Sequence, residues 1–221
     1  MLVHEDASAG ENTLLLHLKA YLYQKGEYDP KAEYSFAPAL CNRIDRNTGG
    51  IVIAAKNAEA LRVMNEKIRN NQITKKYLCL VHGIPSPKQA TLHGYLRKDS
   101  KNNMVQVRDL PFPGAKEIIT AYRVLEARDE GRIALVEVEL ITGRTHQIRA
   151  HMAHIGHPLV GDGKYGINRE ERKEGYKYQA LYSYSLSFDK TQDDTPLSYL
   201  EGKQFTLPKE AVWFWKEDPR S

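Results

Sequence analysis

The chain has 221 residues, 41% of them hydrophobic, and its 32 Lys and Arg against 28 Asp and Glu give a formal charge of +4. This length allows one large domain or two small ones, and the composition excludes a disordered chain. The charge surplus is too small to indicate a nucleic-acid partner by itself. No apolar run approaches the ~20 residues of a transmembrane helix, so no membrane partner is expected.

The two cysteines, Cys41 and Cys79, have no spacing typical of a disulfide framework. Both lie beside apolar residues and are expected to be small buried thiols. This usage suits a reducing compartment, and the first residues do not have the pattern of a secretory signal. We therefore expect a cytoplasmic protein.

The first half of the chain predicts helices on either side of a short strand. Residues 11–25 are amphipathic, and Asn12 or Thr13 could cap this helix. The apolar run 51–56 predicts a buried strand, and residues 57–71 have apolar side chains at helical spacing.

The second half is dominated by strand signals. A strand is expected at 75–81, and further ones at 91–97, 104–107, 117–127, 132–140 and 180–188. Short helices are expected at 145–156 and 208–215. Runs of strands with a few helices predict an α+β fold with a mixed, mostly antiparallel central sheet and flanking helices.

The most informative segment is 42–56, which reads Asn-Arg-Ile-Asp-Arg-Asn-Thr-Gly-Gly-Ile-Val-Ile-Ala-Ala-Lys. It places Asp45 between Arg43 and Arg46, just before the apolar run. A fixed carboxylate between cations suits a nucleophile or an electrostatic catalyst that acts on a polyanion. In isolation, a surface turn with solvated charges would be the better interpretation.

Three motifs in one order argue against that isolated interpretation. Segment 42–56 closely resembles the active-site loop of the RluA-type pseudouridine synthases, written His-Arg-Leu-Asp-Arg-Asp-Thr-Ser-Gly. Two further segments resemble motifs of this family. The second motif is Lys75-Lys76-Tyr77-Leu78 with Val81-His82-Gly83. The third motif is Thr142-Gly143-Arg144-Thr145-His146-Gln147-Ile148-Arg149, and it runs on through 157–162. Together the matches cover most of residues 40–190.

The resemblance implies the pseudouridine synthase fold and isomerisation of uridine to pseudouridine within RNA. The base is detached from C1′, turned and reattached through C5, a reaction that needs no metal and no organic cofactor. Ribosomal RNA of the large subunit is the preferred partner, transfer RNA is an alternative, and a monomer is expected. The whole chain, 1–221, would be one catalytic domain, N-terminally shortened, without the S4-type domain and first strand that relatives have before the equivalent of residues 2–6.

The resemblance also assigns three catalytic residues. Asp45 matches the catalytic aspartate, which acts either as the nucleophile at C1′ or as the base that takes the 2′ proton. Arg149 matches the arginine that pairs with this aspartate, so an Asp45–Arg149 ion pair is expected. Tyr77 matches the tyrosine whose ring stacks on the uracil, and its hydroxyl could help to remove the C5 proton. Without the motifs, Arg149 would be read as an exposed helix arginine and Tyr77 as a half-buried strand residue.

Four basic residues are expected to contact RNA. Arg43 matches the arginine that takes the place of the flipped uridine, and Arg46 and Arg144 are candidates for phosphate contacts or for supporting the fold. Lys76 belongs to a basic run that near this site becomes a candidate for contact with the RNA backbone. Asn42 stands where many relatives have His, so no acid–base role is assigned to it.

Other interpretations depend on weaker signals. His146, His151, His154 and His157 invite a metal site, but their spacing matches no metal motif and no metal is expected. Gly161-Asp162-Gly163-Lys164 has no Walker spacing and is read as a turn. A catalytically idle RNA-binding or ribosome-assembly module on the same fold is the main alternative. A metal-dependent nuclease lacks the clustered carboxylates that it would need.

Overall fold

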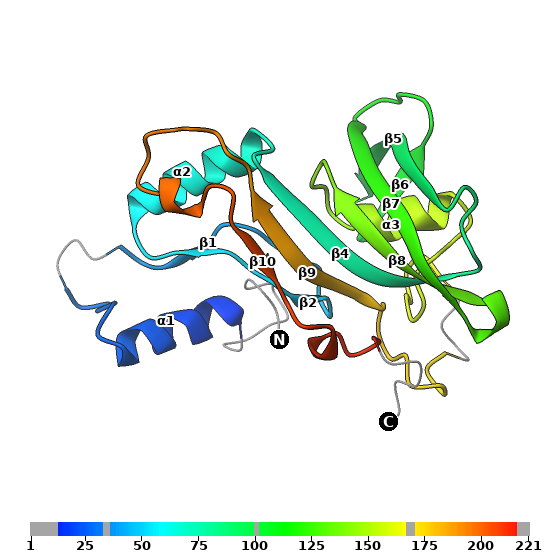
Figure 1. Ribbon diagram of the computed structural model, residues 1–221, viewed down its shortest axis with the longest axis horizontal. Coiled ribbons are helices and arrows are strands. Elements are labelled where there is room, and N and C mark those ends of the chain that lie inside the picture. The colour runs from blue at the N-terminus through cyan, green and yellow to red at the C-terminus, as the bar shows by residue number, and fades with distance from the viewer. Residues whose placement is uncertain (1–12, 33–35, 100–101, 167–170, 216–221) are drawn as a thin grey trace. The chain divides into compact units, whose positions relative to one another are not determined.

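The computed structural model describes residues 13–32, 36–99, 102–166 and 171–215, and the chain divides into two compact units (Figure 1). The first unit comprises Met1–Asn47, Ile51–Ile73 and Ser187–Gln204, and the second comprises Thr48–Gly50, Thr74–Leu186 and Phe205–Ser221. Asn12 and residues 2–6 lie outside the described residues. No helix in the described ranges has the length and apolar character needed to cross a membrane.

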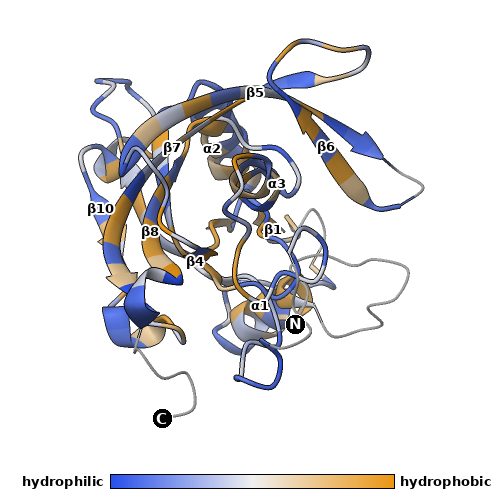
Figure 2. Cartoon of the chain, turned by 90° about the vertical axis from the view of Figure 1, so that its right-hand side faces the viewer, coloured by the Kyte–Doolittle hydropathy of each residue, from blue (hydrophilic) through white to orange (hydrophobic). Residues whose placement is uncertain are grey.

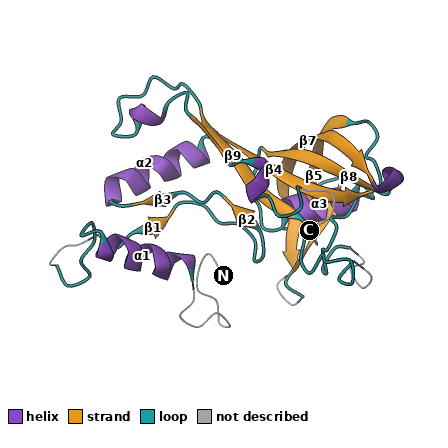
Figure 3. Ribbon diagram, turned by 60° about the horizontal axis from the view of Figure 1, so that its bottom comes forward, coloured by secondary structure: helices purple, strands orange, loops and turns teal. Residues whose placement is uncertain are grey.

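The first unit contains the two predicted helices, α1 (Leu14–Gln24) and α2 (Ala58–Arg69). Thr13 caps α1 by accepting a hydrogen bond from the backbone N–H of Leu16 at 3.2 Å, and Asn57 caps α2 in the same way at Ala60. Next to α2 lies a small antiparallel ladder of β1 (Ala39–Leu40) and β3 (Ala54–Ala55) (Figure 3). Both helices are therefore confirmed, and Thr13 is confirmed as the cap of the first.

The strand predicted at 51–56 is much shorter than expected, because only β3 within it is a strand. Upstream of β3, the backbone of Ile53 makes its hydrogen bonds with a loop. Its N–H donates to Asn42 Oδ1 at 2.7 Å, and its carbonyl accepts from the N–H of Cys41 at 2.8 Å. A side chain thus satisfies a backbone group that a neighbouring strand would otherwise satisfy.

The second unit is built on a mixed sheet that has eight strands among the described residues. Its main path runs in the order β10-β9-β4-β8-β7-β5-β6, and β2 pairs with β9 in parallel. The pairs from β4 through β8, β7 and β5 to β6 are all antiparallel. The strands are β2 (Gly49–Gly50), β4 (Ile73–His82), β5 (Gln89–Asp99), β6 (Met104–Arg108), β7 (Lys116–Arg128), β8 (Ile133–Leu140), β9 (Leu181–Phe188) and β10 (Gln204–Thr206). The predicted fold class, α+β with a mostly antiparallel sheet, is confirmed.

The two faces of the sheet pack against different segments. On one face, α3 (Gln147–His154) contacts β5, β6 and β7 (Figure 2). On the other face, Leu78 and Leu80 of β4 belong to a buried cluster with Val212 and Phe214 from the end of the described chain. Because side chains alternate along a strand, Tyr77 of β4 points to the opposite face from Leu78.

The helix predicted at 208–215 is wrong. The structure has a single 3₁₀ turn at Lys209–Ala211, followed by an extended Val212. Val212 and Phe214 are buried while Trp213 between them is exposed. After Val212 the chain turns, with the Trp215 N–H donating to the Val212 carbonyl at 2.8 Å. Val212 and Phe214 anchor this turn in the buried cluster that contains Leu78 and Leu80.

Candidate active site

The third motif is held in place by the side chain of Gln147, the first residue of α3. Its Nε2 donates to the carbonyl of Ile119 at 3.1 Å and to Thr120 Oγ1 at 3.0 Å, both on β7. Its Oε1 accepts from Thr142 Oγ1 and from the backbone N–H of Arg144, each at 3.0 Å. One buried amide therefore fixes the start of α3 to the sheet and to the turn that carries Arg144.

Arg149 lies in the first turn of α3 and forms a buried bidentate ion pair with Asp162. Nε is 2.7 Å from Oδ2 and Nη2 is 2.8 Å from Oδ1. Burial by itself would raise the pKa of Asp162, but the hydrogen bonds and charge of Arg149, with the backbone N–H groups of Lys164 and Tyr165, lower it overall. The Tyr165 ring centroid lies 5.4 Å from the guanidinium carbon. The orientation of the guanidinium plane is therefore set from outside the helix.

Tyr77 points to the face of the sheet on which α3 packs. It is opposite Val138 of β8, which in turn is opposite Tyr122 of β7. Thr120, two residues from Tyr122 and on the same face, contacts α3 through Gln147. Tyr77 is only 6% exposed. The second unit therefore brings the second and third motifs to one face of its sheet.

Asp45 belongs to the first unit, in the loop between β1 and β2. Two residues separate it from Thr48, which is buried in the second unit, where Thr48 Oγ1 accepts from Gln179 Nε2 at 3.2 Å. Consecutive Cα atoms are about 3.8 Å apart, so the Cα atoms of Asp45 and Thr48 lie within about 11 Å of each other. The expected Asp45–Arg149 ion pair joins residues of two units and stays a prediction.

The four residues expected to contact RNA have different surroundings. Arg43, Arg46 and Arg144 are exposed. Lys76 points to the face opposite Tyr77, and its Nζ lies 3.3 Å from Oε1 of Glu137, which also accepts from Arg123. The RNA contacts stay predictions, and for Lys76 an RNA phosphate would compete with a carboxylate already in place.

The four histidines near α3 each have a separate partner. His146 Nδ1 lies 2.9 Å from the Tyr165 hydroxyl, and His151 Nδ1 lies 3.0 Å from Thr120 Oγ1. His154 pairs with Asp109, and His157 bonds the carbonyl of His82. Within the described ranges, no three His, Cys, Asp or Glu side chains are placed to hold a metal ion.

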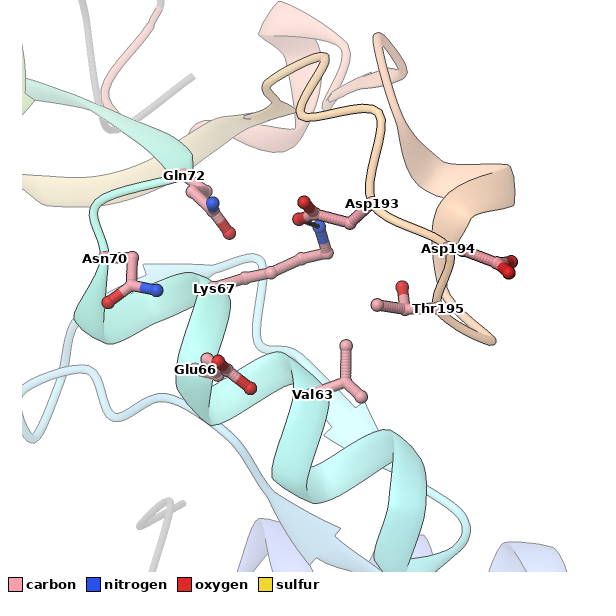
Figure 4. A pocket seen from close by; sticks show the side chains of 8 residues that line it. All are labelled: Val63, Glu66, Lys67, Asn70, Gln72, Asp193, Asp194 and Thr195. Atoms are coloured by element: carbon pink, nitrogen blue, oxygen red, sulfur yellow. Dashed lines mark hydrogen bonds and ion pairs between the residues drawn. The ribbon is translucent and has the colours of Figure 1, made fainter.

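The first unit also has a hollow of about 350 Å³ beside α2 (Figure 4). Its floor is Lys67, whose side chain is 5% exposed and whose Nζ donates to Thr191 Oγ1 at 3.1 Å and to Asp193 Oδ2 at 3.3 Å. The hollow is lined by Val63, Glu66, Lys67, Asn70, Gln72, Asp193, Asp194 and Thr195. Because the buried ammonium already has a carboxylate partner, this cluster joins α2 to the segment around residue 193.

Reasoning from sequence misses Asp162 and Tyr165 as parts of the site. Asp162 falls in a segment whose composition indicates a turn, although it ends the motif run 157–162. The signal available is a carboxylate within a motif that also supplies a buried arginine, since a buried arginine needs an anionic partner. Tyr165 lies beyond the motif and carries no signal.

Comparison with known proteins gives consistent matches. The family model described as RNA pseudouridylate synthase matches residues 1–154. An uncharacterized RNA pseudouridine synthase of Mycoplasma genitalium is 42% identical over 186 residues, which cover 81% of this chain and 56% of the relative. The ribosomal large subunit pseudouridine synthase C of Buchnera aphidicola is 38% identical over 131 residues, or 59% of this chain and 40% of that protein.

The fold is similar to that of solved structures. Human RNA pseudouridylate synthase domain containing 1 superposes with a TM-score of 0.68 at 23% identity, covering 96% of this chain and 80% of the other. At that identity the likeness concerns the fold alone. The chain spans about half the length of the curated relatives that it matches, with 56%, 52% and 48% of three of them covered.

Proposed function

The chain belongs to the RNA pseudouridylate synthase family, and from this premise we propose that it converts uridine to pseudouridine in structured RNA. The observation that carries the proposal is the family match over residues 1–154, which includes the Asp45, Tyr77 and Arg149 positions. The proposal is also supported by the sheet, because Tyr77 and the helix that carries Arg149 lie on the same face of it.

In the proposed mechanism the target uridine leaves the RNA helix and its base stacks on Tyr77. Expelling a base costs a few kcal/mol, and the guanidinium of Arg43 offsets part of this by taking its place. Asp45 then acts on the ribose, either as nucleophile at C1′ or as base at the 2′ hydroxyl. The N1–C1′ bond breaks and the base turns. C5 then bonds to C1′ as the ester bond between Asp45 and C1′ breaks or, on the other route, as Asp45 returns the 2′ proton. The C5 proton leaves with help from the Tyr77 hydroxyl, and N1 of the product carries a proton instead.

Arg149 is proposed to form an ion pair with Asp45. Its bidentate bond to Asp162 supports this role, because it fixes the guanidinium plane. This bond uses two of the five N–H donors that an arginine carries, and the proposed pair with Asp45 would use others. Arg46 and Arg144 are proposed to contact RNA phosphates, and both are exposed.

Ribosomal RNA of the large subunit is the proposed substrate, on the similarity to the Buchnera protein whose name states that target. Such a substrate would place the enzyme in the cytoplasm. Transfer RNA and a catalytically idle RNA-binding module are the competing possibilities, and one experiment separates all three.

The test uses large-subunit ribosomal RNA and a transfer RNA pool, both transcribed in vitro without modification. Each is incubated with the wild-type chain or with Asp45→Asn, and pseudouridines are mapped at single-nucleotide resolution. We expect a site-specific signal in ribosomal RNA with the wild type and none with Asp45→Asn, which should still bind the RNA. RNA binding by both proteins without any new pseudouridine would support the idle module. Equal activity of Asp45→Asn would remove Asp45 from the mechanism.

A further inference from the structure

We propose that Lys75 binds a phosphate group of the uridine nucleotide whose base stacks on Tyr77, and that it is therefore a substrate-binding residue of the site. The inference deepens the proposed function and depends on it for the identity of the ligand. The observations that carry it are the place of the Lys75 ammonium and the lack of a partner for it among the described residues.

Lys75 lies on β4, two residues before Tyr77, so both side chains point to the same face of the sheet. Its Nζ lies beside the turn that precedes α3, because a methyl group added at Gly143 would be 3.8 Å from it. Arg144 follows directly in this turn. The ammonium belongs to the second motif and thus lies against the third, on the face where the base is proposed to bind.

Within the described part of the chain, the Lys75 ammonium has no hydrogen-bond acceptor and no carboxylate partner. The other two lysines shielded from solvent on α2 and β4 are different: Lys67 contacts Asp193, and Lys76 contacts Glu137. Burial lowers the pKa of Lys75, which is the direction expected for a cation that has lost water and gained no anion. The described residues therefore hold a half-buried cation whose charge they do not balance.

A phosphate is the anion that this cation fits best. RNA carries one on every nucleotide, and lysine binds phosphate as a compact point charge. Because the ammonium is half-buried, a phosphate in an intact helix is a poor partner, whereas that of an extruded nucleotide enters with its base. Residues two apart on a strand are roughly 7 Å apart, a span suited to a base on Tyr77 and its own phosphate on Lys75. A carbonyl oxygen of the uracil is the competing partner.

The test uses small probes, so that turnover is not needed. Uridine, uridine 5′-monophosphate and uridine 3′-monophosphate are titrated into the wild type, Lys75→Met, Lys75→Arg and Lys88→Met, and binding is followed by NMR. Lys88 is an exposed lysine in the β4–β5 connection and serves as the matched control.

We expect one of the two phosphates to improve wild-type binding about tenfold over uridine, as for a hydrogen bond to a charged group. Lys75→Met should abolish this ratio, Lys75→Arg should keep most of it, and Lys88→Met should leave it unchanged. Which phosphate shows the effect identifies the 5′ or the 3′ side. Two results would overturn the proposal: no preference for either phosphate in the wild type, or an equal loss of uridine and nucleotide binding in Lys75→Met.

Two further measurements distinguish loss of phosphate binding from a folding defect and from a failure of the proposed function. Since Lys75→Met removes an unbalanced charge and keeps the alkyl chain, the thermal midpoint of the free protein should stay the same or rise. With ribosomal RNA, the slope of log affinity against log salt should become shallower by about 0.7–0.9. A chain that binds the nucleotide through Lys75 but isomerises no RNA would retain the inference and refute the proposed function.

Discussion

Arg149 and Asp162 face each other in a buried bidentate ion pair, with Nε 2.7 Å from Oδ2 and Nη2 2.8 Å from Oδ1. Asp162 has no exposed surface and Arg149 is 5% exposed. A fixed guanidinium is useful to a catalytic carboxylate only if its own orientation is set by something else. Asp162 supplies that constraint from outside the helix, so it acts as a positioning residue for Arg149.

Arg149→Ala is expected to lower both stability and activity. Removing one partner of a buried pair leaves Asp162 as an unbalanced buried charge, which typically costs about 3–5 kcal/mol of unfolding free energy. Urea denaturation measures this loss. Turnover per folded molecule should also fall sharply, because the proposed partner of Asp45 is gone. Near-normal turnover of the folded fraction would contradict the proposed Asp45–Arg149 pair.

Asp162→Asn tests the positioning role, since it keeps Arg149 and a side chain of similar shape. It also removes the carboxylate from the buried guanidinium and so lowers stability, and turnover is therefore compared per folded molecule. Catalysis should fall through kcat with little change in RNA affinity, because the guanidinium is present but less firmly oriented. A wild-type kcat in this variant would mean that Asp162 supports only the fold.

The protein is expected to lose stability as the pH falls from 6.5 towards 4, because of His151. Burial, with the nearby His154 and His93, lowers the pKa of His151 from 6.5 to about 4. Between these values the unfolded chain binds a proton that the folded chain does not, so folding weakens as the pH decreases. At 1.36 kcal/mol per pKa unit, the difference between the two pKa values corresponds to about 3 kcal/mol of unfolding free energy.

His151→Asn is the variant that checks this assignment. It can keep a polar contact with Thr120 but cannot titrate, so its unfolding free energy should be flatter between pH 6.5 and 4 than that of the wild type. Below this window Asp162 adds its own loss, since its lowered pKa gives stability that disappears as the pH falls below its ordinary value of 3.8. An unchanged slope in His151→Asn would assign the pH dependence to other groups.

Gly50→Ala is expected to disrupt the pairing of β2 with β9. Gly50 has φ +115°, and a Cβ there would lie 2.0 Å from the carbonyl oxygen of Ser183. Backbone must move to accept it, and β2 directly follows the loop that carries Asp45. We expect a lower thermal midpoint together with reduced turnover.

Gly26→Ala is the matched control, since Gly26 has φ +70° and a Cβ added there would meet nothing within 4 Å. It should show only the cost of a left-handed backbone for a residue with Cβ, about 1–2 kcal/mol, and normal turnover per folded molecule. If both glycine variants behaved alike, the contact with Ser183 would not matter.

Local signals in the sequence are sufficient for much of the fold. The caps Thr13 and Asn57 mark the two N-terminal helices, and alternation of side chains marks the long strands of the sheet. The segment 208–215 differs from its predicted helix because Val212 and Phe214 are anchored by the sheet, a tertiary effect that helix propensity does not contain. In the same way, the strand predicted at 51–56 is short because the Ile53 N–H donates to the Asn42 side chain instead of to a neighbouring strand.

For the site, the motifs predict Tyr77 and Arg149 as site residues but do not predict which side chains hold them in place. The Asp162 partner of Arg149 and the two hydrogen bonds from Gln147 to β7 depend on which segments fold side by side. Strand alternation predicts that Lys75 and Lys76 point to opposite faces of the sheet, but the carboxylate that pairs with Lys76 comes from β8. Partners supplied by distant strands are beyond the reach of single-sequence reasoning.

The Lys67–Asp193 pair in the first unit should respond unequally to removal of its two partners. Lys67 is 5% exposed at its side chain, whereas Asp193 is 41% exposed. Lys67→Met leaves a carboxylate that water can solvate. Asp193→Ala leaves a buried ammonium that keeps its hydrogen bond to the Thr191 hydroxyl and its electrostatic interaction with Glu201, but loses its salt bridge. Asp193→Ala should therefore lower the thermal midpoint more than Lys67→Met. The double variant should resemble Lys67→Met, because the buried charge is then gone. Equal effects of the two single changes would show that the ammonium is not desolvated, and neither change should alter turnover per folded molecule.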